Sequence, residues 1–193
     1  PGEYAVTGAV HLASRNAGGA WIVNERIAPP ADSDAMGFGA ACALSDTVLV
    51  IGAPDAAAGA VFVYMRNSAG TWRLLFSAQG EQDGERFGAA VATVGSRILV
   101  GSPSDDLNSD EPAADFGSAT LLEFNNAGEI TSRAHLTSPE KERSERFGAA
   151  ISLTSTHAFI GAPGNNGRND VPVSASGAVF ALTLAAPETA RMI

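Results

Sequence analysis

The chain has 193 residues, of which 45% are hydrophobic and 17% are charged, and its formal net charge is −9. This length suits one domain, or a piece of a larger one. The acidic balance excludes a protein that grips the phosphate backbone of a nucleic acid, and no apolar run reaches the roughly 18 residues of a membrane span.

Short apolar runs separated by glycine, asparagine and serine turns predict thirteen β-strands. No segment of useful length shows the 3.6-residue period of a helix, so we expect an all-β fold. The strands form groups of two, four, four and three: residues 8–13 and 21–27; 40–44, 47–52, 59–64 and 71–78; 89–94, 97–101, 117–124 and a run from 130; 149–154, 157–161 and 177–182. The second strand of each of the last three groups, at 47–52, 97–101 and 157–161, is a continuous apolar run, which predicts burial on both faces.

One string recurs three times and sets the register of these groups. Phe38, Phe87 and Phe147 each precede a glycine and two alanines, and another glycine follows each of them fourteen residues later, in VIGAP, VGSP and IGAP. A repeated four-stranded unit of roughly 50 residues is typical of a propeller blade. We therefore expect small residues on the crowded inner strands and the phenylalanines buried between neighbouring blades.

These motifs carry a resemblance to a known family. The run from Phe-Gly to Gly-Ala-Pro, followed by GAVFVY, GSATLLEF or GAVFAL, resembles the FG-GAP repeat, which is the blade of integrin α-subunit-like propellers. The resemblance covers almost the whole chain. It implies a β-propeller of four-stranded antiparallel blades, usually seven to a ring, and an extracellular or cell-surface location.

The predicted strands make up an incomplete ring. The chain is expected to be one partial propeller over residues 1–193, with the end of a blade at 1–35, blades at 36–80 and 86–137, and a last, possibly incomplete blade at 146–193. This is about half of a seven-bladed ring. We expect a piece of a longer protein, because open blade faces must be covered. The cover is the rest of the propeller, a partner protein, or a second copy that completes the ring as a homodimer.

One loop offers ligands for a metal ion. The resemblance implies a calcium loop between the first and second strands of a blade, but those connections are tight here. In the acidic loop 104–115, Asp106, Asn108 and Asp110 have the alternating oxygen spacing that calcium accepts. Glu111 stands where a tight calcium loop has glycine, so a solvated acidic loop is the alternative. Calcium is the one cofactor considered.

Enzyme signatures are missing, so we expect a noncatalytic protein. The three histidines fall on a third strand, a fourth strand and a turn, without neighbours of ligand type: His11, His135 and His157. Carboxylates cluster before the phenylalanines, and although a hydrolase uses such pairs, a solvated surface is favoured for them: Asp32, Asp34, Glu81, Asp83 and Glu85. Cys42 is the only cysteine, and we expect it to be a small buried hydrophobe.

The sequence leads to three hypotheses about function. The leading one is a noncatalytic protein-binding or adhesion module that presents loops on a rigid propeller. The second is a carbohydrate-binding, lectin-like propeller in which Trp21 and Trp72 stack on sugar rings, although their equivalent positions favour packing between blades. The third is a structural subunit of a larger assembly, docked through its unfinished blade. No nucleic-acid partner and no membrane insertion are expected.

Overall fold

The computed structural model describes residues 8–31, 33–107, 114–166 and 176–184. Within these residues the protein is all-β, with thirteen strands in four antiparallel sheets, and none of them forms a helix able to span a membrane. The predicted strands are thereby confirmed. They are β1 (Val10–Arg15), β2 (Trp21–Ile27), β3 (Ala41–Leu44), β4 (Val48–Ala53), β5 (Ala60–Arg66), β6 (Trp72–Gln79), β7 (Ala90–Val94), β8 (Arg97–Ser102), β9 (Ser118–Phe124), β10 (Ile130–Thr137), β11 (Ala150–Leu153), β12 (His157–Ala162) and β13 (Ala178–Thr183).

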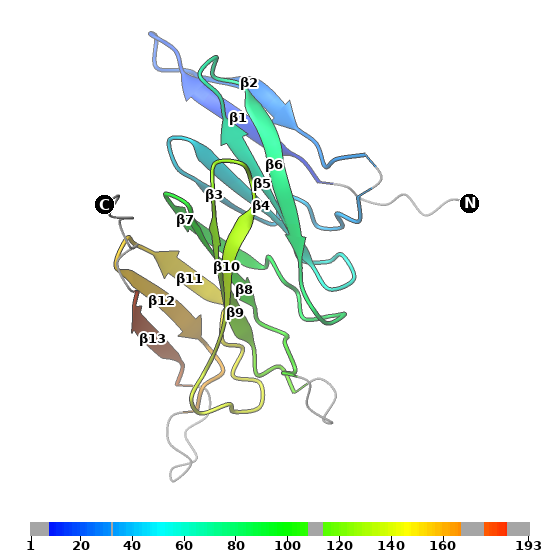
Figure 1. Cartoon of the computed structure of the whole chain (residues 1–193), viewed down its shortest axis with the longest axis vertical. Coiled ribbons are helices and arrows are strands. Elements are labelled where there is room, and N and C mark those ends of the chain that lie inside the picture. Colours follow the sequence, from blue (N-terminus) through cyan, green and yellow to red (C-terminus); the bar gives the residue numbers. More distant parts are fainter. Residues whose placement is uncertain (1–7, 32, 108–113, 167–175, 185–193) are drawn as a thin grey trace, which may run out of the picture.

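Each sheet is a meander in which consecutive strands pair. The four sheets are β1–β2, β3–β6, β7–β10 and β11–β13, and they follow one another in chain order along the molecule (Figure 1). First strands of consecutive sheets lie side by side, with β3 against β7 and β7 against β11. No closed ring or barrel forms among the described residues, so the propeller and its blade count stay predictions.

The second strands show how stacking controls burial. Every residue of β4 and β8 is buried, as the continuous apolar runs predicted, because each of these sheets has a neighbour on both faces. In β12 buried residues alternate with exposed or half-buried ones. The prediction of two-sided burial is therefore wrong for β12, since no sheet among the described residues covers its outer face.

The repeated phenylalanines join neighbouring sheets, as predicted. Phe87 is fully buried and packs with Val50 and Val61 of one sheet and with Ile98 and Leu122 of the next. The other two phenylalanines occupy the equivalent cores on either side. Such burial of an aromatic side chain is the main apolar contribution at each junction.

Backbone contacts complete each junction. Gly59 forms an isolated parallel bridge with Phe87, and Gly117 forms the same bridge with Phe147. Gly88, directly after Phe87, has a φ of +94°, which a residue with a side chain adopts only with strain. The Phe-Gly pair therefore supplies a buried ring and a sharp backbone turn at the same place.

Two predictions about single residues are wrong. Cys42 is exposed, because its face of β3 looks toward the position of a preceding first strand, and the two-stranded sheet β1–β2 has none among the described residues. His157 begins β12 and does not lie in a turn.

Candidate functional site

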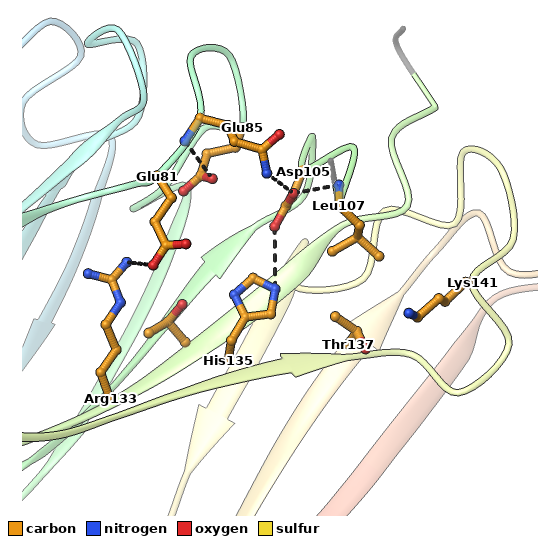
Figure 2. Close-up of a pocket in the computed structure, with 10 residues that line it drawn as sticks. Glu81, Glu85, Asp105, Leu107, Arg133, His135, Thr137 and Lys141 are labelled. Carbon is orange, nitrogen blue, oxygen red and sulfur yellow. Dashed lines mark hydrogen bonds and ion pairs between the residues drawn. The ribbon is translucent and has the colours of Figure 1, made fainter. Parts of the chain in front are cut away.

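An acidic pocket lies at one edge of the sheet β7–β10. It has a volume of about 280 Å³ and collects side chains from the β6–β7 loop, the segment after β8, strands β9 and β10, and the segment after β10 (Figure 2). Its lining residues are Glu81, Gln82, Glu85, Asp105, Leu107, Thr120, Arg133, His135, Thr137 and Lys141.

Asp105 is the most deeply buried polar group of the acidic pocket, with none of its surface exposed. Its Oδ1 accepts hydrogen bonds from the backbone N–H of Leu107, at 2.7 Å, and from Nε2 of Gln82, at 3.3 Å. Its Oδ2 has no hydrogen-bond partner. It faces Nε2 of His135 at 3.6 Å, which is an ion-pair contact when the histidine is protonated (Figure 2).

Glu85 lies beside Asp105 and is also buried. Its Oε2 accepts the backbone N–H of Gln82 at 3.2 Å. The pKa of Glu85 is raised to about 7, first by burial and then by the negative charges of Asp105 and Glu81, against backbone hydrogen bonds that lower it. The raised pKa therefore reports first the removal of this carboxyl group from water, and second the nearby carboxylates.

The basic side chains of the acidic pocket lie on and after β10. Arg133 forms an ion pair with Glu81 at 3.4 Å, donates to the carbonyl of Gln79 at 3.3 Å, and lies over the ring of Phe87. These contacts hold its guanidinium along the wall of the pocket. His135 and Lys141 line the remaining part.

The next repeat shows the same corner with different chemistry. Asn165 is equivalent to Asp105 by its backbone contacts. The carbonyl oxygen of Asp105 accepts the N–H of Gly117, and the carbonyl oxygen of Asn165 accepts the N–H of Gly177, each at 2.9 Å. Nδ2 of Asn165 donates to Oε1 of the buried Glu145 at 2.9 Å. Glu145 is equivalent to Glu85 by its place before Phe-Gly. Gln82 donates to Asp105 in one repeat, and Glu142 stands in the place of Gln82 in the other, so each corner combines two carboxylates with one amide.

The predicted calcium ligands are only partly within the described residues. Asp106 accepts the backbone N–H of Asp115 on its Oδ1, at 2.8 Å, and does not line the acidic pocket. Asn108 and Asp110 lie outside the described residues, so the calcium prediction stays a prediction. Where the structure is described, no three His, Cys, Asp or Glu side chains come together as metal ligands.

The carboxylates before the phenylalanines have different environments. Glu85 is buried, so the expectation of a solvated side chain is wrong for it, whereas Asp83 is exposed. Asp34 accepts the backbone N–H of Ala57 at 3.1 Å. Asp32 lies outside the described residues. His135, although expected without a role, lines the acidic pocket.

Asp105 was not identified from the sequence. The signal for it is positional: Asp105 and Asn165 both stand four residues after the glycine of the second strand, and Glu85 and Glu145 both stand two residues before the phenylalanine. A repeat comparison at these two positions would have found the carboxylate pair.

A second feature is the outer face of the sheet β11–β13, which we call the open face. A hollow of about 540 Å³ lies there, and its lining is mostly apolar: residues 149–150, 161–163 and 176–179. Val179 is 73% exposed, whereas the equivalent Val61 and Ala119 are both 0% exposed. The hollow is therefore the place that a neighbouring sheet occupies in the two internal repeats.

The tryptophans differ in the same way. Trp72 packs against the core between the first two sheets, which confirms packing between sheets for this residue. Trp21 is 70% exposed, with the guanidinium of Arg15 over its ring, so the same expectation is wrong for Trp21. It belongs to the outermost sheet at the other end of the molecule (Figure 1).

Comparisons with known proteins add no relative. No known family matches the chain, and no curated protein matches it.

Proposed function

We propose that this chain is a noncatalytic protein-binding module whose open face binds a Phe-Gly segment of a partner repeat. One observation carries the proposal. A Cβ on Gly52 or Gly101 would overlap the carbonyl oxygen of the next repeat, at Gly88 or Gly148, whereas a Cβ on the equivalent Gly161 meets nothing closer than Ala150 at 3.4 Å.

The shape of the hollow indicates the chemistry of its occupant. In the internal repeats the same place is filled by a phenylalanine ring, a glycine in the left-handed region and a strand of small residues. Gly177 offers the backbone that pairs with such a phenylalanine, as Gly59 and Gly117 do inside the chain. The partner is therefore a polypeptide with an unpaired Phe-Gly-Ala-Ala segment.

A second copy of this chain fits less well as the occupant. Each of its three Phe-Gly segments already contacts a preceding glycine: Phe38 contacts Gly8, and the other two form the bridges to Gly59 and Gly117. A second copy would have to open one of these junctions and expose a buried phenylalanine, at a cost of several kcal/mol.

A hairpin peptide tests the proposal. Residues 142–162 carry Phe147, Gly148 and the strands β11 and β12. We expect a fluorescent peptide of this sequence to bind the whole chain saturably, as followed by anisotropy. A peptide with Phe147→Ala should bind at least tenfold more weakly, because the ring supplies most of the apolar burial.

Gly161→Ala in the whole chain is the matched variant. It should abolish binding, because its Cβ occupies the place of the incoming carbonyl oxygen, and it should leave the unfolding midpoint unchanged, because the space there is open. Equal binding of both peptides, or binding that survives Gly161→Ala, would overturn the proposal. So would a dimer in sedimentation that excludes the peptide, because the occupant would then be a second copy.

The wider architecture is part of the same proposal. We infer that the four sheets are blades of a partial propeller, and that the chain is an FG-GAP-like protein of the extracellular space or the cell surface. The side-by-side first strands and the repeated Phe-Gly junctions support this arrangement.

Carbohydrate binding is less well supported. The exposed ring of Trp21 is the one feature that favours it, since sugars stack on open aromatic faces. Its exposure has the same cause as that of Phe159 at the opposite end: each belongs to an outermost sheet. A glycan array separates the two functions, because a lectin would bind sugars and lose that binding in Trp21→Ala.

A further inference from the structure

We propose that β1 binds an extended, acidic segment of a partner polypeptide as an added strand, along the edge that faces away from β2. We call this edge the free edge. It lies at the opposite end of the molecule from the open face (Figure 1), and neither proposal depends on the other. Three observations carry it: an edge that is paired in the other repeats, exposed side chains beside that edge, and a cationic outer face.

The first observation is the unpaired edge itself. β1 is equivalent to β5 and β9, because each of these strands follows a glycine that contacts a Phe-Gly segment: Gly8, Gly59 and Gly117. β5 pairs with β4 and β6, and β9 pairs with β8 and β10. Among the described residues β1 pairs with β2 alone. Its free edge therefore presents backbone N–H and C=O groups to a further antiparallel strand.

The second observation is the exposed surface that such a strand would cover. In the internal repeats the strand in this place also contacts the first strand of the next sheet, β4 with β7 and β8 with β11. There Val91 and Ile151 are half-buried against the junction cores. The equivalent Cys42 of β3 is exposed, and Leu44 on the same face is 61% exposed. A strand on the free edge would bury both side chains.

The equivalent strand β4 indicates the inward-facing residues of this occupant. By the register of β4 on β5, Val50 marks the place opposite Leu12, and Gly52 marks the place opposite Val10. Val50 is fully buried, so an apolar residue fits the first place. A Cβ on Gly52 would overlap the carbonyl oxygen of Gly88, so a glycine fits the second.

The third observation indicates the outward-facing residues of the occupant. Val10 and Leu12 pack against the next sheet, so the alternate residues of β1 and their partners on β2 point away from it. These outward side chains are all exposed and include two arginines and a histidine but no acidic residue: His11, Ala13, Arg15, Trp21, Val23 and Arg26. Among the described residues neither arginine forms an ion pair. Carboxylates opposite His11 and Ala13 would lie beside these basic groups, and opposite charges on neighbouring strands attract.

Two labelled peptides test the proposal by fluorescence anisotropy with the whole chain. Both have the sequence of residues 45–54, which contains β4, but differ at the two outward positions. The acidic peptide carries Leu49→Glu and Ile51→Glu, and the basic peptide carries Leu49→Lys and Ile51→Lys. We expect the acidic peptide to bind saturably and at least tenfold more tightly than the basic one. Adding Gly52→Val to the acidic peptide should weaken binding at least tenfold, because the new side chain would meet the backbone below it.

The single cysteine reports where the peptide binds. Because Cys42 is exposed beside the free edge, its reaction with a thiol reagent should be fast in the unaltered chain. The acidic peptide at saturation should slow this reaction at least tenfold, and the basic peptide at the same concentration should not. Arg15→Glu should weaken binding of the acidic peptide at least fivefold, whereas Arg73→Glu, the same change at an exposed position of β6, should leave it unchanged.

The other occupants are outcomes of the same test. A thiol that already reacts slowly without peptide would show that the chain covers its own free edge, and slowing with protein concentration would show a second copy; either would overturn the proposal. Equal binding of the two peptides, equal binding by Arg15→Glu, or a thiol still reactive under saturating peptide would overturn it as well. Gly161→Ala should bind the acidic peptide as the unaltered chain does, so failure here is distinct from failure at the open face.

Discussion

Asp105→Asn should stabilise the protein at neutral and alkaline pH. In the folded chain Asp105 and Glu85 are adjacent buried carboxyl groups, and Asp105 is a cause of the raised pKa of Glu85. An asparagine keeps an oxygen for the backbone N–H of Leu107 and places an amide where Oδ2 lies now. That amide would face Nε2 of His135, which lies 3.6 Å from Oδ2.

The size of the effect follows from the pKa of Glu85. Its rise from 4.5 to about 7 corresponds to about 3 kcal/mol of lost stability once the group is ionised. Burial is the larger cause, so the share of Asp105 is about 1 kcal/mol. A new amide donor adds about 1 kcal/mol. The variant should therefore be about 1–2 kcal/mol more stable above pH 7.

The sign of the pH dependence is fixed by the direction of the shift. Because the folded state holds the proton of Glu85 more firmly than the unfolded state, the unaltered chain loses stability as the pH rises from 4.5 to about 7. Below pH 4.5 the group is protonated in both states and the loss is absent. Asp105→Asn should flatten this slope, and Glu85→Gln should remove the part that belongs to Glu85.

Urea unfolding at pH 4.5, 6 and 8 measures these free energies, provided the slope with urea is unchanged. The reasoning is refuted if Asp105→Asn is less stable than the unaltered chain at pH 8. It is also refuted if the gain is as large at pH 4.5 as at pH 8, because the effect would then not come from ionised Glu85.

Three further substitutions test the stacking of the sheets and the paired corner, each by urea unfolding. Gly101→Ala should cost about 2–4 kcal/mol, because its Cβ would overlap the carbonyl oxygen of Gly148; an unchanged midpoint would contradict the junction. Phe87→Ala should cost about 3–5 kcal/mol, since the ring is fully buried between two sheets; a loss below 1 kcal/mol would contradict that packing. Asn165→Asp should cost about 2–4 kcal/mol, because it leaves the buried Glu145 beside a second carboxylate; a neutral result would count against the carboxylate argument at Asp105 as well.

The strands and their register could be predicted from the sequence because the signals are local. Apolar runs, turn residues and the fourteen-residue spacing from phenylalanine to glycine depend only on neighbouring positions in the chain. The burial of Phe87 was also predictable, since the same ring recurs in every repeat. All of these features are properties of a single repeat.

Exposure at the ends could not be predicted in this way. Phe159, Trp21 and Cys42 have well-buried or half-buried equivalents in other repeats, and they differ only in which sheet lies beside them. A pattern within one repeat carries no information about its neighbour. The two-sided burial predicted for β12 was wrong for this reason.

The acidic pocket was missed for a different reason. Glu85 stands in a polar loop, and polar loops are normally solvated. It is buried because the segment after β8 folds over it and brings Asp105, twenty residues further along the chain, into contact. Residue type and local polarity do not reveal such a contact, although the repeat alignment contains it.

Equivalent positions in a stack of repeats separate two kinds of difference. Gly161 and Gly101 are the same residue type in equivalent positions, and they differ only in whether another sheet lies beside them. The open space at Gly161 exists because its sheet is the last of the four, so the partner that fits it resembles one of the repeats. Asp105 differs from Asn165 in its own side chain, while its backbone hydrogen bond is the same. Their surroundings differ as well, because Asp105 faces His135 of the fourth strand β10, whereas the sheet that follows has three strands among the described residues. The amide is not lost from this corner, because Gln82 donates to Oδ1 of Asp105 at 3.3 Å and stands where the next repeat has Glu142. The exchange of Asp105 and Gln82 for Asn165 and Glu142 therefore keeps the number of carboxylates equal at the two corners.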